Sequence, residues 1–191
     1  IQSHVTSFCN FNAFQSAYRR CHSIETALLC TLDNIYNNAG HGSATALISL
    51  DLSAAFDTID HSILLNRLQA SFGVAGSALS WLSTYLANRT QIVQIGSSSS
   101  GVTSLSSGVP QRSVLGPLLF SIYTSPIANI AAAHNVCQQQ YVDDTQLYVA
   151  ISRTSCTSAI TCLETCLLSL HSWFLHNGLA VNPDKSEAIV F

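Results

Sequence analysis

Charged side chains are scarce in this chain. Asp, Glu, Lys and Arg make up 9% of its 191 residues, whereas ordinary soluble domains have about 25%. It has no methionine, so no initiator, and its only lysine is Lys185. A surface with so few charges is poorly soluble by itself. The sequence also begins in mid-pattern at Ile1 and stops within a strand-like run at Phe191. We therefore expect an excised piece of a larger polypeptide.

A strong positive charge is also absent. The formal net charge is −3, which excludes a global electrostatic attraction to nucleic acid. Any such partner has to be attracted by a local groove or by flanking segments. Arg19 and Arg20 form the only double basic pair. The pair by itself is consistent with a solvated surface or with a phosphate contact.

The seven cysteines do not form a recognisable framework. Their number is odd and no C-x-x-C occurs, which favours reduced thiols packed as small apolar groups over disulfides or zinc. Cys162 and Cys166 are four residues apart on an expected helix, the spacing of one face of a metal site, but packed thiols are favoured there too. There is no secretory signal, and the longest apolar runs are too short to cross a bilayer. We expect no membrane association and a reducing, intracellular setting.

What the chain does have is a high apolar content, 48%, enough for a sizeable core. Alternating patterns predict strands, and patterns with a helical period predict helices, one of them kinked at Pro126. The expected helices are 23–37, 63–72, 77–88, 115–133 and 154–176, and the expected strands are 44–52, 90–95, 102–105, 136–141, 145–151 and 188–191. This order indicates an α+β fold in which helices pack on one face of an antiparallel sheet. The apolar face of the first helix is expected to comprise Ile24, Ala27, Leu28, Leu32 and Ile35.

Two adjacent aspartates stand between two strand-like runs, at the expected tip of a hairpin. Asp143 and Asp144 repel each other and have no cationic neighbour nearby in sequence. A structural turn and a Mg²⁺ site both fit such a pair. Asp51 ends the apolar run 44–52, which is typical of a central strand. If these elements pair in one sheet, three carboxylates meet at one edge, as two-metal phosphoryl transfer requires.

The residues around these aspartates carry a family resemblance. The chain resembles the reverse transcriptase of a non-LTR retrotransposon, a long interspersed element, over about residues 11–191. Four motifs occur in the family's order, and an upstream segment at 15–23 resembles the connection between fingers and palm. The motifs are LDLSAAFDTIDH at 50–61, SGVPQ at 107–111 continuing to SVLGP at 113–117, YVDD at 141–144, and GLAVNPDKS at 178–186.

The resemblance implies a polymerase palm with part of the fingers. Residues 1–43 would be partial fingers and the fingers–palm connection, and residues 44–191 the palm, ending before the primer grip and thumb. The implied activity is template-directed nucleotidyl transfer to a primer 3′-hydroxyl with two Mg²⁺ ions. The implied partners are an RNA template, a DNA primer, deoxynucleoside triphosphates and the rest of a retrotransposon polyprotein, and the implied location is the nucleus.

The resemblance also implies a role for individual residues. Asp51, Asp143 and the backbone carbonyl of Leu52 would hold metal, with Asp144 as an auxiliary carboxylate. Backbone N–H groups of Ser53, Ala54 and Ala55 would bind the triphosphate, Phe56 would exclude a 2′-hydroxyl, and Gln111 would touch nucleotide or template. Arg19 and Arg20 would contact template or phosphate. Lys185 would act as a general acid near the leaving pyrophosphate, although a solvated loop lysine is also consistent with its position.

Some residues near the motifs are expected to have other roles or depart from the pattern. Asp57 and Asp60 are expected to cap the following helix, and His61 is given no catalytic role. Arg112 replaces a glycine of the family pattern, where close backbone approach to the nascent base pair is expected. Because of Arg112 and the missing lobes, we expect the fragment to be inactive alone. A non-catalytic retrotransposon remnant is the alternative. A metal-dependent phosphohydrolase could use the same aspartates, but it would not require Phe56, Gln111 and Lys185, so it is disfavoured.

Overall fold

A four-stranded antiparallel sheet lies at the centre of the molecule. In the computed structural model, which describes residues 2–191, its strand order is β10–β1–β8–β7. Its strands are β1 (Ala44–Leu50), β7 (Cys137–Tyr141), β8 (Asp144–Ile151) and β10 (Glu187–Val190). Strand β1 pairs with β8 from Ala44 opposite Ile151 to Leu50 opposite Thr145. The end of β1 therefore lies beside the turn between β7 and β8.

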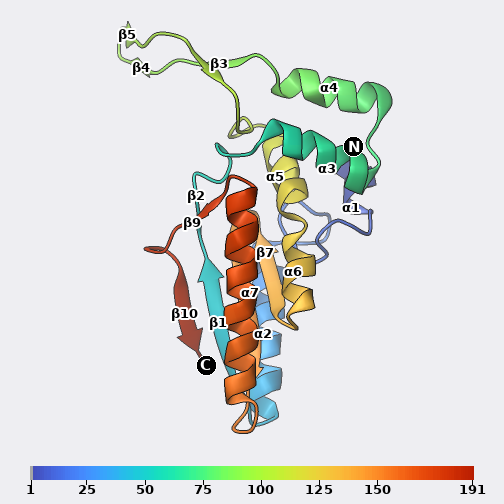
Figure 1. Ribbon diagram of the computed structural model, residues 1–191, viewed down its shortest axis with the longest axis vertical. Helices are drawn as coiled ribbons and strands as arrows, with labels where there is room; N and C mark the ends of the chain where they lie inside the picture. The colour runs from blue at the N-terminus through green and yellow to red at the C-terminus, as the bar shows by residue number, and fades with distance from the viewer. Residues whose placement is uncertain (1) are drawn as a thin grey trace.

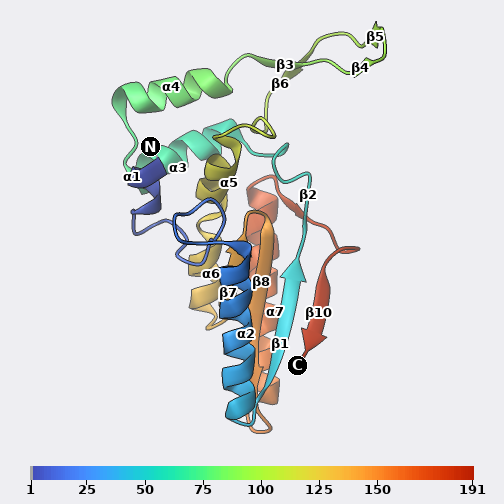
Figure 2. The same cartoon turned by 180° about the vertical axis from the view of Figure 1, so that it is seen from behind.

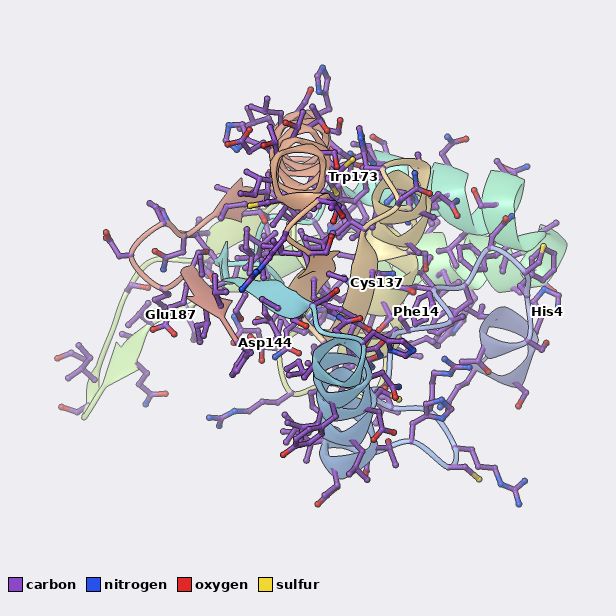
Figure 3. The ribbon with its side chains drawn as sticks, turned by 90° about the horizontal axis from the view of Figure 1, so that it is seen from below. His4, Phe14, Cys137, Asp144, Trp173 and Glu187 are labelled. Atoms are coloured by element: carbon purple, nitrogen blue, oxygen red, sulfur yellow. The ribbon has the colours of Figure 1, made fainter. Side chains whose placement is uncertain are left out.

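Helices cover both faces of this sheet. Helices α6 (Ile127–Ala133) and α7 (Cys156–His176) lie on one face and α2 (Ile24–Gly40) on the other (Figure 3). The α2 face is tied by polar contacts: Thr31 Oγ1 donates to Gln146 Oε1 at 3.1 Å. The α+β class and the antiparallel sheet are confirmed, and α2 covers the second face in addition to the helices expected on one face.

The remaining elements lie above the sheet in Figures 1 and 2, at the end where β1 stops. They are α1 (Gln2–Thr6), α3 (His61–Phe72), α4 (Gly76–Leu86), α5 (Gly116–Thr124), β2 (Leu52–Ser53), β9 (Ala180–Val181), β3 (Arg89–Gln91), β4 (Gln94–Ile95), β5 (Ser98–Ser99) and β6 (Thr103–Leu105). Strand β3 pairs with β6 and strand β4 pairs with β5, and together these two pairs form a narrow arm that projects from the body (Figure 1). The expected hairpin 90–95/102–105 is thus two short two-stranded ladders.

The main core lies between the α7 face of the sheet and helices α3, α4 and α5. The side chains of Phe72, Phe120, Tyr123 and Phe174 are at most 1% exposed. Helix α5 buries almost its whole length, because it passes between α3 and the sheet. This central helix fixes the segments that precede and follow it, including the motif at 107–117.

Two details of the helices differ from the sequence expectation. The expected helix 115–133 is broken: α5 ends at Thr124 and α6 begins at Ile127, because Pro126 has no N–H to continue the ladder. In α2, Ala27 and Thr31 are the buried residues. The expected inward residues Ile24, Leu28 and Leu32 are 44–50% exposed, so the helix packs through its small residues.

Helix α7 is long and apolar enough, by length and composition, to cross a membrane. This corrects the expectation that no stretch reaches that length. Its buried residues Leu163, Cys166, Leu170 and Phe174 follow a helical period and join the main core. Helix α7 therefore packs on the sheet through one apolar face. Cys166 is fully buried in that face, which agrees with the expectation that the thiols at 162 and 166 pack as small apolar groups.

Candidate active site

Asp51 directly follows β1, and its backbone is held on both sides by the segment 182–186. The Asp51 N–H donates to Ser186 Oγ at 3.2 Å, and Asp51 O accepts from Asn182 N at 2.8 Å. Ser186 Oγ in turn donates to Asn182 O at 2.7 Å. Lys185 lies in this turn with an exposed side chain. The fourth motif is thereby fixed against the first.

Asp143 lies in the two-residue turn between β7 and β8. Tyr141 pairs with Asp144, so the turn consists of Val142 and Asp143. Val142 has φ 58°, a conformation that β-branched residues rarely adopt. A two-residue hairpin turn with positive φ at its first position normally has glycine there. The turn that presents Asp143 is therefore strained at Val142.

The three aspartates share one electrostatic site. Burial, together with the charge of Asp51, raises the pKa of Asp143 above its usual range. Burial raises the pKa of Asp144, and the charges of Asp143 and Asp51 raise it further. The upward shifts mean that like charges lie close together in a partly desolvated place. The register of β1 and β8 and these shifts place the three aspartates near one another at one edge of the sheet.

The donor set fits Mg²⁺ in its chemistry, because carboxylate oxygens are the ligands Mg²⁺ prefers and a cation would remove the mutual repulsion. Within residues 2–191, however, no group of three His, Cys, Asp or Glu side chains is drawn together around a single point. The aspartates therefore form an open edge of carboxylates. Figure 3 shows Asp144 on the side of the sheet next to α2, where it lines a hollow with residues of that helix.

Phe56 follows the short turn after Asp51 and is fixed by α5. Its half-buried ring stacks on Phe120, with centroids 4.8 Å apart and planes at 25°. Ala54, within the turn, has φ 49°, and its carbonyl accepts from Asp57 N at 2.8 Å. The backbone that resembles the triphosphate-binding turn is thus a tight turn whose aromatic residue rests on a rigid helix.

The second motif packs directly on the first. Gly108 N donates to Ile59 O, and Val109 N donates to Phe56 O, both at 2.8 Å. A Cβ on Gly108 would lie 2.8 Å from the Asp57 carbonyl oxygen, and Gly108 has φ 86°. Glycine is therefore required at this position, both for its conformation and for the close approach.

Asp57 holds the side chain of Gln111. Gln111 Nε2 donates to both carboxylate oxygens of Asp57, at 2.9 and 3.0 Å. The expectation that Asp57 caps the following helix is therefore wrong. Asp60 does cap α3, since its Oδ1 accepts from Ser62 N and Ile63 N at 2.8 and 2.9 Å.

His61 and Arg112 lie on either side of this contact. His61 Nε2 lies 2.7 Å from Gly108 O, which gives the imidazole a structural partner. Arg112 has φ 58° and an exposed side chain. Position 112 therefore takes the left-handed conformation for which glycine is suited, as its place in the motif predicts. A surface hollow of about 510 Å³ adjoins Gln111, with Asp57 and Arg89 in its lining.

Arg19 and Arg20 lie in a different place. Arg19 Nη1 donates to Ala13 O and Gln15 O at 2.7 and 3.2 Å, so its half-buried side chain closes its own loop. Arg20 is exposed. Both line a hollow with residues of α1, and the aspartates are not among its lining residues. The structure brings Asp51, Asp143, Asp144, Phe56 and Gln111 to one end of the sheet, and Arg19 is linked to that end through Gln15, whose side chain binds Val142.

Sequence reasoning missed the residues that support the site. Asn182 and Ser186 were within a recognised motif but had no role of their own, and Asp57 was given a different one. Gln15, considered below, contacts the turn at Val142 and Asp143 from more than a hundred residues away in sequence. Only their position beside the motif segments could have pointed to them.

Comparison with known proteins identifies the family. The family model described as reverse transcriptase (RNA-dependent DNA polymerase) matches residues 1–190. The chain therefore belongs to the reverse transcriptase family. It is 31% identical over 144 residues to a probable RNA-directed DNA polymerase from transposon BS of Drosophila melanogaster, covering 73% of this chain and 16% of that protein.

Other relatives come from similar elements. The RNA-directed DNA polymerase from mobile element jockey of Drosophila melanogaster is 27% identical, over 74% of this chain and 16% of its own length. The Pol polyprotein from the type-1 retrotransposable element R2 of Popillia japonica is 24% identical, over 78% of this chain and 25% of its own length. The chain thus spans a quarter or less of these relatives.

Solved structures show the same fold. Apo telomerase from Candida tropicalis superimposes with a TM-score of 0.68 at 12% identity, covering 98% of this chain and 35% of that one. A telomerase from Candida albicans in complex with a fragment of telomeric RNA gives a TM-score of 0.63 at 12% identity, over 88% of this chain and 31% of that one. At this identity the likeness establishes the fold, an α+β polymerase palm and fingers.

Proposed function

We propose that this chain is the palm of an RNA-directed DNA polymerase that transfers nucleotides to a primer 3′-hydroxyl by two-metal catalysis. Asp51 and Asp143 would hold the metal ions, with the carbonyl of Leu52 as a further ligand and Asp144 as an auxiliary carboxylate. Bound Mg²⁺ would lower the pKa of the attacking hydroxyl and stabilise the leaving oxygen. The observation that carries the proposal is the strand register that places Asp51, at the end of β1, beside the turn between β7 and β8, where its charge helps to raise the pKa of Asp143 and Asp144.

The other site residues would bind and select the nucleotide. Backbone N–H groups at Ser53, Ala54 and Ala55 would bind the triphosphate. The ring of Phe56, supported by Phe120, would contact the sugar and exclude a 2′-hydroxyl. Gln111, with Nε2 held by Asp57, would present its remaining amide oxygen to the nucleotide or template. Lys185, in the turn attached to Asp51, would donate a proton to the pyrophosphate.

The partners follow from the same reaction. They are an RNA template, a DNA primer and deoxynucleoside triphosphates, together with the rest of a retrotransposon polyprotein. Arg19 and Arg20 would contact the template or phosphates at the edge of the fingers, within residues 1–43, while 44–191 form the palm. The reaction would take place in the nucleus, without a membrane. Because the chain spans a quarter or less of its relatives, we expect it to bind metal and nucleotide but not to extend a primer alone.

The experiment is a titration of the 191-residue chain with Mn²⁺, as a probe for Mg²⁺, and then with a deoxynucleoside triphosphate. Asp51→Asn and Asp143→Asn should each abolish tight Mn²⁺ binding, and Asp33→Asn, an exposed aspartate on α2, should not change it. Nucleotide binding should depend on the metal. Wild-type chain that binds neither would support the alternative, a non-catalytic remnant, which Arg112 at a glycine position favours.

A further inference from the structure

A buried glutamine from the N-terminal segment binds the backbone of the catalytic turn. Gln15 is fully buried. Its Oε1 accepts from Val142 N at 2.9 Å, and its Nε2 donates to Val142 O at 3.0 Å. The same Oε1 accepts from Ala17 N at 3.1 Å. One side chain therefore satisfies both backbone groups of the residue that precedes Asp143.

We propose that Gln15 is a positioning residue, which holds the Val142 backbone in its strained conformation and thereby sets the direction of the Asp143 carboxylate. The proposal rests on the proposed function, in which Asp143 is a metal ligand. Val142 has φ 58°, and such a strained conformation persists only where the surroundings impose it. A primary amide, with a donor and an acceptor on one rigid plane, suits this task.

Gln15 can impose a position because its own backbone neighbours are fixed to β7. Ser16 N donates to Gln140 O at 2.9 Å, and Gln140 N donates to Phe14 O at 3.0 Å, a parallel bridge at the edge of the sheet. Gln139 reinforces it, since its Nε2 donates to Phe14 O and to Ser16 Oγ at 2.9 and 2.7 Å. Both flanks of Gln15 thus belong to the sheet that ends at the aspartates.

Gln15 and Gln139 make different kinds of contact between the N-terminal segment and the β7–β8 hairpin. Gln139 attaches the N-terminal segment to β7 without touching the turn, whereas Gln15 touches the turn itself. Removing either amide weakens the same attachment, but only removal of Gln15 frees the Val142 backbone. Gln139 is therefore a matched control for the stability cost of losing a buried amide.

The first experiment compares Gln15→Met and Gln139→Met in the 191-residue chain, each with its measured free energy of unfolding. Methionine has a similar length and removes both hydrogen bonds to Val142, together with the one from Ala17 N. In wild type, hydrogen exchange of the Val142 amide should be slow; Gln15→Met should lose this protection and Gln139→Met should retain it. Mn²⁺ affinity should fall about tenfold or more in Gln15→Met, as for outer-shell partners of metal ligands, and remain near wild type in Gln139→Met.

A rescue tests the strain directly. Glycine adopts positive φ without strain, so Val142→Gly added to Gln15→Met should restore most of the Mn²⁺ affinity. If Gln15→Met does not fold, Gln15→Asn, which is one methylene too short to reach both backbone groups, gives the same comparisons. Equal losses of Val142 protection and of Mn²⁺ affinity in the two methionine variants would overturn the proposal.

The two proposals fail in different ways. A wild-type chain that does not bind Mn²⁺ overturns the two-metal function, and Val142 exchange then decides on Gln15 alone. Protection of Val142 that is lost only in the Gln15 variants supports the positioning role. If the Val142 amide stays protected from exchange without the Gln15 amide, the positioning role is excluded, whether or not the chain binds Mn²⁺.

Discussion

The ring of Phe56 lies on the ring of Phe120, with centroids 4.8 Å apart and an interplanar angle of 25°. Phe120 is fully buried in α5, so the ring that would contact the sugar rests on the core of the protein. Offset stacking of this kind adds about 0.5 to 1.5 kcal/mol beyond area burial. The position of Phe56 is therefore set by a buried ring of α5.

Phe120→Leu should lower the selectivity for deoxynucleotides. Loss of the supporting ring leaves Phe56 free to move away from the sugar. The ratio of dUTP to UTP affinity, measured by titration with Mg²⁺ present, should fall, and the free energy of unfolding should fall by about 1 to 2 kcal/mol. Phe72→Leu, another fully buried phenylalanine, should have a similar stability cost and leave the ratio unchanged. A changed ratio in both variants would show that stability alone is responsible.

Asp143→Asn should stabilise the metal-free chain at pH 7. The pKa of Asp143 is raised in the folded state, so its ionisation penalises folding. This penalty is absent below the unfolded pKa, about 3.9, grows as pH rises through the folded pKa, and is complete above it. In urea unfolding with EDTA present, Asp143→Asn should therefore have a higher free energy of unfolding than wild type at pH 7, but not near pH 3.

Added Mg²⁺ should reverse this order, because only the wild-type carboxylate gains a cation. Asp33→Asn, at an exposed site on α2, should follow wild type throughout. A destabilised Asp143→Asn at pH 7 without metal would mean that Asp143 is already satisfied by protein groups.

Arg112→Gly should stabilise the chain by about 0.5 to 1 kcal/mol, because a left-handed backbone is costly for any residue with a Cβ. Arg112→Ala removes the long cationic side chain but keeps the strained backbone, with φ 58° in wild type. Metal-dependent nucleotide binding that improves with both variants would locate the obstruction in the side chain. Improvement with glycine alone would locate it in the backbone, and unchanged binding in both would exclude Arg112 as an obstruction.

Arg67→Lys should lower the free energy of unfolding by about 2 kcal/mol. The guanidinium of Arg67 lies 4.9 Å from the Tyr123 ring centroid and 5.5 Å from that of Trp173. It also donates to Asn177 Oδ1 at 2.8 Å and to the Tyr123 carbonyl. Lysine cannot reproduce this planar arrangement between α3, α5 and α7. Arg153→Lys, at an exposed position, should be neutral in the same urea experiment.

Cys166 should be the slowest of the seven thiols to react with a disulfide reagent. Burial raises its pKa to about 11, and its side chain is fully covered, so thiolate and access are both lacking. Native protein should show a single slow thiol, absent in Cys166→Ala, and denatured protein should show seven fast ones. A uniformly fast native reaction would mean that α7 does not stay packed on the sheet.

The motif segments could be predicted from sequence because their chemistry is local. Asp51 at the end of an apolar strand and Asp143 in a hairpin turn were placed correctly, and Asp60 caps its helix as expected. The failures are tertiary. Periodicity cannot tell which side of α2 meets the sheet. It correctly selected Ala27, but it also selected Leu28 and Leu32, which are exposed, and it did not select Thr31, which is buried. It also cannot show that Asp57 holds Gln111.

The close approach at Gly108 has a consequence for inheritance. All glycine codons begin with the same two bases, so any change at either base replaces Gly108 or ends translation. Each replacement brings at least a Cβ, which would lie 2.8 Å from the Asp57 carbonyl oxygen. Since that same aspartate holds Gln111, a single base change here displaces two motifs together. In a genomic copy that accumulates mutations without selection, codon 108 is therefore a place where function is lost in one step.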